Sequence, residues 1–373
     1  MVGVDLRGHP MAKARTIELR LGNGRTRSAS ALGNNAAWNC CCDRDTPMIG
    51  SLWIAREVSC HCGRRYRVVA DKETGKQVDA VEETTVTDRV THVRRPDEQS
   101  GADAPIEVHG VDWSGAVNAG KHAWWAKGRR DGSRLRLDSL DRGDSLEESG
   151  QDRDRFLDAV VGRIARLERV AVGFDFPFGL PAALLNGGTW TEFVASFPSC
   201  FPTPESFRSW CRERAGGREL KRVTDKVAKT PFAAYNLRLY LQTYFGIAGI
   251  LAPLCGSGRA VAPPMQSLRS DVPWLLEVCP ASTLKRLKLA RSYKGRSQQN
   301  EDARRIILDA LCERDLLAVP SSRHVAAMVE DSGGDALDAV VAAIATACAV
   351  GDQQFPRARP WHEDYRREAV VWF

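Results

Sequence analysis

The sequence lacks any run of about 18 uncharged apolar residues, the length that a membrane-spanning helix needs. Its N-terminal stretch, MVGVDLRGHP, lacks the charged start and apolar centre of a secretory signal peptide. Internal repeats and low-complexity tracts are also missing. We therefore expect a cytoplasmic protein that makes no contact with a membrane, while its oligomeric state stays open.

Charge of one sign does not dominate the composition either. The chain has 373 residues, of which 43% are hydrophobic and 27% charged, as in ordinary globular proteins. That length suits roughly two to three domains of about 150 residues each. A net charge of +6 does not by itself indicate a nucleic-acid partner, although it is compatible with one.

Of the 11 cysteines, five are close together and the others are scattered, as small buried hydrophobic residues usually are. Two C-x-C pairs, Cys40 with Cys42 and Cys60 with Cys62, are separated by 17 residues. Four thiolates suit tetrahedral Zn²⁺, so the pattern resembles a small zinc ribbon, although ribbons usually use C-x-x-C. Unligated thiols are the alternative. A module of about 35 residues builds little core, so we expect this zinc to be structural.

Shifts in composition divide the chain into five segments. The N-terminal residues are polar, a charged stretch poor in large apolar side chains follows the cysteines, and alternating strand and helix patterns come after it. We predict a polar arm (1–35), a zinc-ribbon-like module (36–71), a charged linker (72–105), an α/β domain (106–351) and a C-terminal tail (352–373).

The predicted α/β domain begins with three strand patterns, at 106–112, 122–126 and 135–140, followed by one helical pattern. The next strand, V-A-V-G-F, is apolar on both faces, as in the interior of a parallel sheet. A mostly helical insertion (182–272), a strand W-L-L-E-V-C and two closing helices complete the order. This is the order of the ribonuclease H-like fold, a mixed sheet flanked by helices, here with the insertion between strands 4 and 5.

Carboxylates stand on the central strands of the predicted sheet. Asp112 ends the first strand and Asp175 ends the fourth; these strands would be parallel neighbours, and open α/β sheets form their sites at such carboxyl ends. Glu277 lies within the fifth strand. Asp335 and Asp338 are three residues apart near the start of an Ala-rich helix, whose apolar pattern Asp338 interrupts. We predict that these five residues are catalytic.

Crowded carboxylates repel one another unless cations neutralise them, and hard oxygen ligands favour Mg²⁺ or Mn²⁺. We expect Asp112, Asp175 and Asp338 to bind such ions, and a cluster of this kind can hold two metals about 4 Å apart. Ser114 is small enough to let a substrate approach closely, and we assign it to substrate binding. Two acids have structural alternatives, because Asp335 follows Gly-Gly as a helix N-cap would and Asp175 is able to cap a turn.

Five motifs follow one another in this part of the chain: G-V-D-W-S-G-A, G-F-D-F-P-F-G-L-P, K-R-V-T-D, L-E-V-C-P-A-S with Y-K-G shortly after, and D-A-L-D-A-V-V-A-A-I-A-T-A. Together they resemble the uncharacterised DUF429 family over about residues 106–351. The resemblance implies a ribonuclease H-like fold and a nuclease-like activity. It also implies that Asp112, Asp175, Asp338 and Glu277 occupy the acidic positions of the family.

The resemblance further implies roles for three residues outside the acidic set. Arg222 and Asp225 fall on the insertion motif K-R-V-T-D, and Lys294 falls on Y-K-G, so we assign these residues to substrate binding. Cys279 is a departure, since an aromatic residue commonly stands at that position before proline. This departure concerns local packing more than the acidic site.

Two segments of the predicted domain are basic. Residues 208–229 contain eight Lys or Arg against three acids, and residues 285–305 contain eight against two. A groove lined in this way would attract phosphates and bind them in a salt-dependent manner. Solvated helix faces are the simpler alternative for both segments.

Three functions are compatible with these features. The first is a divalent-metal-dependent nuclease or phosphodiesterase that acts on nucleic acid or another phosphoester. The second is a catalytically inactive module of the same fold that binds nucleic acid or protein. The third is an ATP-using enzyme of the actin-like fold, because G-V-D-W-S-G is faintly similar to a phosphate-binding D-x-G-G turn, but the chain has no second Gly-rich phosphate loop. The paired carboxylates favour catalysis.

Overall fold

The computed structural model describes the chain in parts and divides it into two compact units, Met1–Arg95 and Pro96–Phe373. The described residues are 15–21, 25–32, 35–39, 48–49, 57–59, 65–70, 78–83, 105–185, 187–351, 362 and 364–373.

The described strands of the first unit form a seven-stranded sheet in the order β4-β3-β2-β1-β7-β6-β5. Strands β1 and β2 form an antiparallel hairpin, whereas β1 and β7 are parallel. The two buried residues of β1, Ile17 and Leu19, alternate with exposed ones, as expected of a strand with one covered face. The strands are β1 (Arg15–Arg20), β2 (Thr26–Leu32), β3 (Asn35–Ala37), β4 (Met48–Ile49), β5 (Glu57–Ser59), β6 (Arg65–Ala70) and β7 (Val78–Glu83).

This sheet differs from the expected division into arm, module and linker. The segment predicted as a polar arm supplies β1 and β2, and the segment predicted as a linker supplies β7, which pairs with both β1 and β6. Strand β7 reads V-D-A-V-E-E. Its three acids leave too few apolar residues for the alternation typical of a strand to be recognised. The four cysteines predicted to bind zinc, Cys40, Cys42, Cys60 and Cys62, lie outside the described residues.

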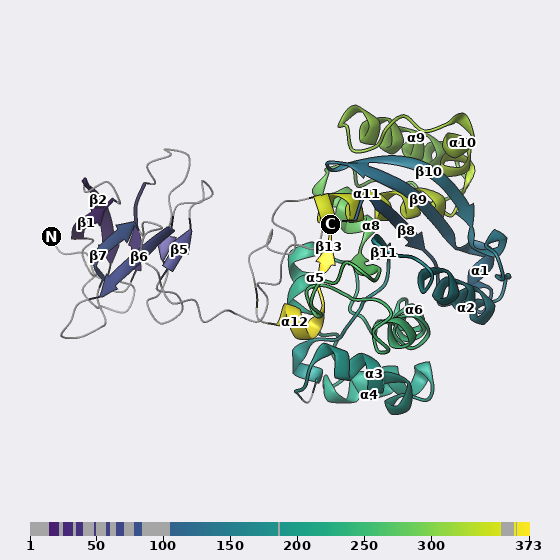
Figure 1. Ribbon diagram of the computed structural model, residues 1–373, viewed down its shortest axis with the longest axis horizontal. Helices are drawn as coiled ribbons and strands as arrows, with labels where there is room; N and C mark the ends of the chain where they lie inside the picture. The colour runs from purple at the N-terminus through teal and green to yellow at the C-terminus, as the bar shows by residue number, and fades with distance from the viewer. Residues whose placement is uncertain are drawn as a thin grey trace. The chain divides into compact units, whose positions relative to one another are not determined.

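The second unit contains a six-stranded mixed sheet in the order β10-β9-β8-β11-β12-β13 (Figure 1). Strand β9 is antiparallel to β10 and to β8, and the remaining strands are parallel to one another. The predicted pairing of β8 with β11 is confirmed. The strands are β8 (Glu107–Asp112), β9 (Trp124–Asp131), β10 (Arg134–Arg142), β11 (Val170–Phe174), β12 (Trp274–Val278) and β13 (Val371–Trp372).

Helices cover both faces of this sheet, which makes the unit an α/β structure (Figure 1). The helices are α1 (Ala119–His122), α2 (Arg153–Ile164), α3 (Trp190–Cys200), α4 (Pro204–Arg214), α5 (Val223–Ala228), α6 (Tyr240–Gly246), α7 (Ala252–Leu254), α8 (Pro280–Arg286), α9 (Gln298–Glu313), α10 (Ser322–Glu330), α11 (Asp335–Gly351) and α12 (Tyr365–Glu368), with 3₁₀ turns η1 (Gly143–Ser145) and η2 (Ala182–Leu184) and a π turn η3 (Ile247–Leu251).

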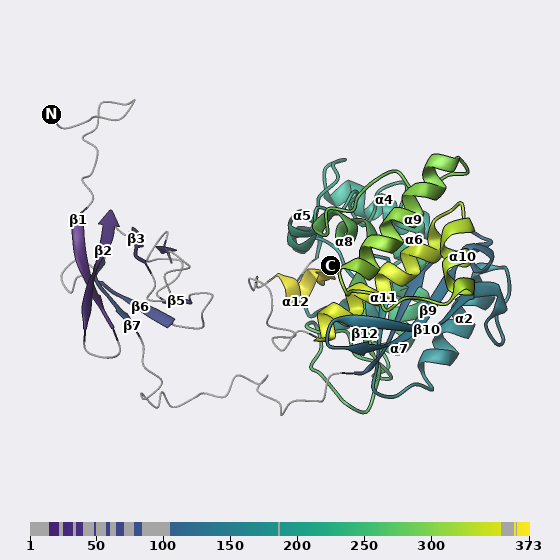
Figure 2. The same ribbon diagram turned by 90° about the horizontal axis from the view of Figure 1, so that it is seen from above.

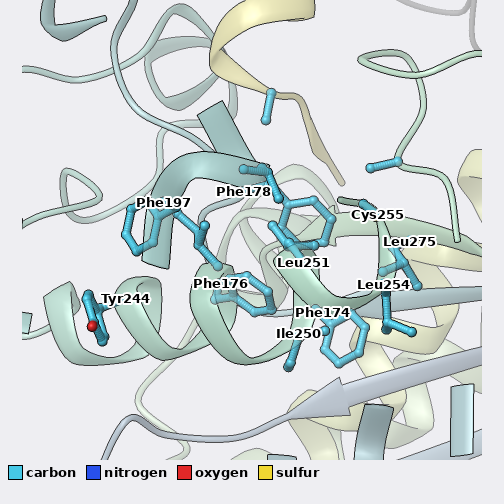
Figure 3. Packing of buried hydrophobic residues seen from close by; sticks show 14 of the residues in the cluster. Phe174, Phe176, Phe178, Phe197, Tyr244, Ile250, Leu251, Leu254, Cys255 and Leu275 are labelled. Atoms are coloured by element: carbon cyan, nitrogen blue, oxygen red, sulfur yellow. The ribbon is translucent and has the colours of Figure 1, made fainter. Parts of the chain in front are cut away.

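The sheet separates two hydrophobic cores, because successive side chains of a strand point to opposite faces. On β11, Val172 and Phe174 join the core formed with α2, α3, α4 and α6, whereas Ala171 joins the core formed with α8, α9, α10 and α11. The first core is rich in aromatic rings, among them Phe176, whose centroid lies 4.9 Å from that of Phe178 (Figure 3). Figure 2 shows α8, α10 and α11 grouped together on the second face.

Helix α11 lies directly on β8 because neither element has bulky side chains where they meet. A Cβ atom built on Gly110 would stand only 2.2 Å from Ala339 O and from Ala343 N. Nearly every residue of α11 is buried, and most are alanine or valine. The Ala-rich sequence therefore brings the first turn of α11 to the carboxyl end of β8.

The last described residues belong to the fold, although the sequence predicts a tail. Strand β13 pairs in parallel with β12, with Glu277 opposite Val371. The Glu368 carboxylate accepts hydrogen bonds from Ala182 N and Val223 N, both at 2.6 Å. The run A-V-V-W-F is too short for its period to be recognised, so the sequence gives no sign of this strand.

Among the described residues, no single helix has both the length and the apolar character that crossing a membrane requires. Helices α10 and α11 meet these criteria only when taken as a pair, which is bent by 118°.

Candidate functional site

Three carboxylates meet where β8 ends and α11 begins. Asp112 is the last residue of β8, and Asp335 and Asp338 belong to the first turn of α11. One oxygen from each of the three lies within 4.8 Å of the others. Asp112 shares its face of the sheet with Gly110, on which α11 packs, so the alternation of the strand directs its carboxylate toward the helix.

The fourth predicted acid, Asp175, flanks this set without joining it. Its backbone N donates to Val111 O at 3.3 Å, which holds the residue after β11 beside the end of β8. Burial and the nearby charge of Asp338 raise the pKa of Asp175 to about 7. The structure therefore brings Asp112, Asp335 and Asp338 together, and it places Asp175 within electrostatic reach of Asp338.

The carboxylates of the cluster have perturbed protonation. Burial raises the pKa of Asp112 well above its usual value, and the charges of Asp338 and Asp175 raise it further. Burial also raises the pKa values of Asp335 and Asp338, although Lys294 opposes the rise. Burial is the main cause of each shift, and neighbouring carboxylates add to it at Asp112; a bound divalent cation would offset both effects.

Lys294, which the sequence predicts to bind substrate, contacts the cluster directly. Its Nζ lies 2.7 Å from Asp338 Oδ2 and 3.5 Å from Asp335 Oδ1. Burial lowers the pKa of Lys294, but the charges of Asp338 and Asp112 outweigh that effect and raise it above its usual value. The ammonium is therefore a fixed positive charge within the cluster.

Tyr293 is a second member of the cluster that the sequence did not assign. Its hydroxyl donates to Asp338 Oδ1 at 2.6 Å, and the side chain is only 8% exposed. Burial and the charge of Asp338 raise the pKa of Tyr293, so the hydroxyl keeps its proton. The Y-K-G motif was the available signal, because it places Tyr293 next to Lys294.

Arg304 and Asp331 hold the loops that present these side chains. The buried Arg304 guanidinium donates to Tyr293 O at 2.6 Å and to Val329 O at 2.7 Å. The Asp331 carboxylate accepts from Ala336 N at 2.9 Å, so Asp331 satisfies a backbone group at the start of α11. Asp335 is the first residue of α11 rather than the residue before it, and its Oδ1 lies 3.5 Å from Lys294 Nζ.

Gln242 of α6 connects the ends of two strands beside the site. Its Nε2 donates to Trp113 O at 2.6 Å and to Asp175 O at 2.5 Å. These carbonyls follow β8 and β11, so one side chain holds the two acid-bearing loops together. Sequence reasoning missed Gln242 because a glutamine in a helix has no distinguishing pattern.

The structure does not bring Glu277, Arg222 and Asp225 to the carboxylate cluster. Glu277 shares its face of β12 with Leu275, in the aromatic core on the opposite side of the sheet from α11. Its carboxylate accepts from Arg222, whose guanidinium also donates to Asp225 at 2.8 and 3.0 Å. Arg222 is 1% exposed, and the charges of Asp225 and Glu277 raise its pKa although burial alone would lower it.

The buried ion pairs leave no free surface on the Arg222 side chain for a substrate, which corrects the role predicted for Arg222, and they place Glu277 and Asp225 as its partners. Glu277 also accepts from Phe178 N at 2.9 Å, which fixes the F-P-F turn that follows Asp175. Ser114 lies in the turn after β8, where its Oγ accepts from Ala116 N at 3.5 Å, and its role in substrate binding stays a prediction.

Residues 110–360 match the model of a family described as protein of unknown function (DUF429). The match spans more than half of the chain, so the chain belongs to this family, and the resemblance noted from the motifs is confirmed. No curated protein and no solved structure matches the chain.

Proposed function

We propose that this protein is a divalent-metal-dependent phosphodiester hydrolase whose metal ion binds to Asp112, Asp335 and Asp338. The observation that supports the proposal is the convergence of three carboxylate oxygens within 4.8 Å of one another, contributed by a strand and a helix. Rigid elements position such ligands more accurately than loops do.

The donor set suits Mg²⁺ or Mn²⁺. The three groups are carboxylates, and hard oxygen ligands select these ions over zinc. Burial raises the pKa values of Asp112 and Asp338, and a bound cation would lower them by stabilising the charged carboxylates. Asp175 lies close enough to add to the negative field of the site.

The strand order supports the ribonuclease H-like part of the proposal. Two antiparallel pairings, β10 with β9 and β9 with β8, are followed by the parallel strands β11 and β12, and the helical insertion lies between these two. A shared strand order is an analogy of fold, and it does not define a reaction. The reaction class therefore rests on the carboxylate cluster.

Three groups would take part in such a reaction: the bound ion, Lys294 and Asp175. A bound divalent ion would polarise a phosphoryl oxygen and lower the pKa of a water molecule. Lys294 places an ammonium beside the cluster, where it would attract the phosphate of the substrate and neutralise its charge. The Asp175 carboxylate, held beside the end of β8, would be the group next to the cluster that accepts and returns a proton. Nucleic acid is the substrate class that we propose, because the segments 208–229 and 285–305 are basic.

The decisive test compares Asp112→Asn with the wild type on labelled single- and double-stranded DNA and RNA, with Mn²⁺ or Mg²⁺ and with EDTA. The exchange keeps the shape of the side chain and removes its charge, so we expect metal-dependent cleavage to disappear. Asp309→Asn, on the exposed surface of α9, is the matched control and should keep full activity. Cleavage that survives Asp112→Asn would contradict the proposal, and metal binding without any cleavage would favour the inactive binding module.

A structural zinc in the first unit is a separate proposal. It rests on the two C-x-C pairs, Cys40 with Cys42 and Cys60 with Cys62. Metal analysis of the purified full chain should find one zinc per molecule, and a double Cys40→Ser and Cys60→Ser variant should lose it. Equal zinc content in the two proteins would overturn the assignment.

A further inference from the structure

The carboxylate cluster contains a positive charge of its own, the Lys294 ammonium. We propose that the cluster holds a single divalent cation, and that Lys294 occupies the place that a second cation would take in a two-metal site. This inference rests on the proposed function, since it specifies how many ions that same site binds.

The first argument concerns Asp338, whose two oxygens are both engaged. Oδ1 accepts from the Tyr293 hydroxyl at 2.6 Å, and Oδ2 lies 2.7 Å from Lys294 Nζ. Two metal ions about 4 Å apart are usually bridged by a carboxylate that directs one oxygen to each ion. Because Oδ1 is held by a hydroxyl and Oδ2 by an ammonium, Asp338 is not placed to bridge two metal ions. Each oxygen has a second lone pair, so Asp338 can still bind one ion.

The second argument concerns Asp112, the third carboxylate of the cluster. Within the described residues, no hydrogen-bond donor contacts the Asp112 carboxylate, although the residue is only 7% exposed. A buried carboxylate without a partner is strongly disfavoured unless a cation compensates it. One ion beside Asp112 would remove this penalty, while Lys294 compensates Asp335 and Asp338.

The third argument is that the position of Lys294 is fixed by the fold. The backbone on either side of it is held by Arg304, which donates to Tyr293 O at 2.6 Å and to Gly295 O at 3.1 Å. Gly295 N donates to Ser332 O at 2.8 Å, which ties the loop to the residues before α11. A lysine fastened in this way differs from a mobile surface lysine that meets a carboxylate by chance.

A consequence for the substrate follows from exposure. The Lys294 side chain is 52% exposed, whereas the Asp338 side chain that it contacts is 4% exposed. The ammonium therefore lies at the outer side of the cluster, where a phosphodiester would arrive from solvent. Unlike a metal ion, an ammonium needs no fixed coordination geometry, so it can contact a phosphate oxygen while keeping its ion pair.

The test counts Mn²⁺ ions bound to the full-length protein by titration calorimetry and by electron paramagnetic resonance. We expect one ion per wild-type chain, with the spectrum of an isolated Mn²⁺, and no binding at this site in Asp112→Asn. In Lys294→Met the ammonium no longer competes, so a second Mn²⁺ should bind or the first should bind roughly tenfold more tightly. Lys294→Arg keeps the charge and should bind one ion, and Lys226→Met, exposed on α5, should behave as the wild type.

Two results would overturn the inference. Two spin-coupled Mn²⁺ ions in the wild type would remove it and leave the proposed function intact, as would a Lys294→Met variant that is folded by circular dichroism and binds Mn²⁺ as the wild type does. A wild-type protein that binds no divalent ion at Asp112 would remove the inference and the proposed function together.

Discussion

Gly110 of β8 lies against Ala339 of α11 so closely that a Cβ on the glycine would stand 2.2 Å from the alanine's carbonyl oxygen. This contact determines how near the first turn of α11 comes to the end of β8. The positions of Asp335 and Asp338 relative to Asp112 therefore depend on the absence of a side chain at residue 110.

We predict that Gly110→Ala destabilises the second unit and weakens metal binding. The added methyl group meets backbone atoms, which move only with the helix, and overpacking of this kind costs roughly 1–3 kcal/mol or more. Urea unfolding and Mn²⁺ titration measure the two effects. Gly162→Ala, in the last turn of α2 and with only Arg166 Nη1 nearby at 3.8 Å, should instead stabilise the protein by about 0.5–1 kcal/mol. Equal effects of the two substitutions would contradict the packing argument.

A second prediction concerns the pH dependence of stability without metal. The folded-state pKa of Asp175 is about 7, and that of Asp112 is also raised, whereas an aspartate in the unfolded chain titrates near about 4. Between these values the folded protein binds more protons than the unfolded one, so these groups make stability fall as the pH rises from about 4 to about 7.

Thermal melts in EDTA should therefore give a higher melting temperature at pH 5.5 than at pH 8, and Mg²⁺ or Mn²⁺ should raise the melting temperature most at pH 8. Asp112→Asn removes one of the repelling charges, and it should raise the melting temperature in EDTA at pH 8 while abolishing the increase due to metal. A pH dependence that is the same in Asp112→Asn and in the wild type would show that the cluster is not its source.

A third prediction tests the buried ion pairs. Arg222→Met leaves the carboxylates of Asp225 and Glu277 buried without their partner, which typically costs about 3–5 kcal/mol. We expect this loss in the free energy of unfolding, measured by urea denaturation. Arg291→Met, at an exposed position, is the control and should change stability by less than about 0.5 kcal/mol. A mild effect of Arg222→Met would mean that the pairs contribute little.

A fourth prediction concerns the C-terminal residues. Glu368→Ala removes the acceptor of Ala182 N and Val223 N; these hydrogen bonds are partly buried, so we expect the lower part of the about 1–3 kcal/mol that a buried donor without a partner costs. We expect a corresponding decrease in thermal stability. Glu313→Ala, exposed near the end of α9, should leave it nearly unchanged. Stability that is insensitive to Glu368→Ala would show that this segment does not help to hold the fold.

The contrast between Asp112 and Glu277 shows which site positions can be predicted from the sequence and which cannot. Asp112 ends an apolar strand, so its position at the carboxyl end of that strand was predictable from a local pattern. Glu277 lies in a strand buried on both faces, where the alternation of residues does not reveal which face meets the other acids. Its partner Arg222 is 55 residues away along the chain, and contacts of that separation form only when the tertiary structure does.

The same distinction explains the remaining differences. The Y-K-G motif indicated Lys294, but its ion pair with Asp338 depends on a loop that Arg304 holds from another helix. Strand β13 has two residues and depends on pairing with β12, so no local pattern predicts it. Short-range patterns therefore predicted five strands of the second unit's sheet and named the three acids of the cluster, whereas β7, β13 and the pairing of charges across the sheet required the three-dimensional structure.

Because Asp335 and Asp338 belong to a single turn of α11, their carboxylates are displaced together whenever that helix is displaced. The size of the opening between them and Asp112 then depends on one variable, the separation of α11 from β8, and the Gly110 contact holds that separation near its minimum. A site that resists widening favours small ions, since Mg²⁺ needs oxygen distances of about 2.1 Å and Ca²⁺ about 2.4 Å. Discrimination between these two cations would thus depend on the small size of Gly110 and Ala339, which bind no ion themselves and lie two residues from Asp112 and next to Asp338.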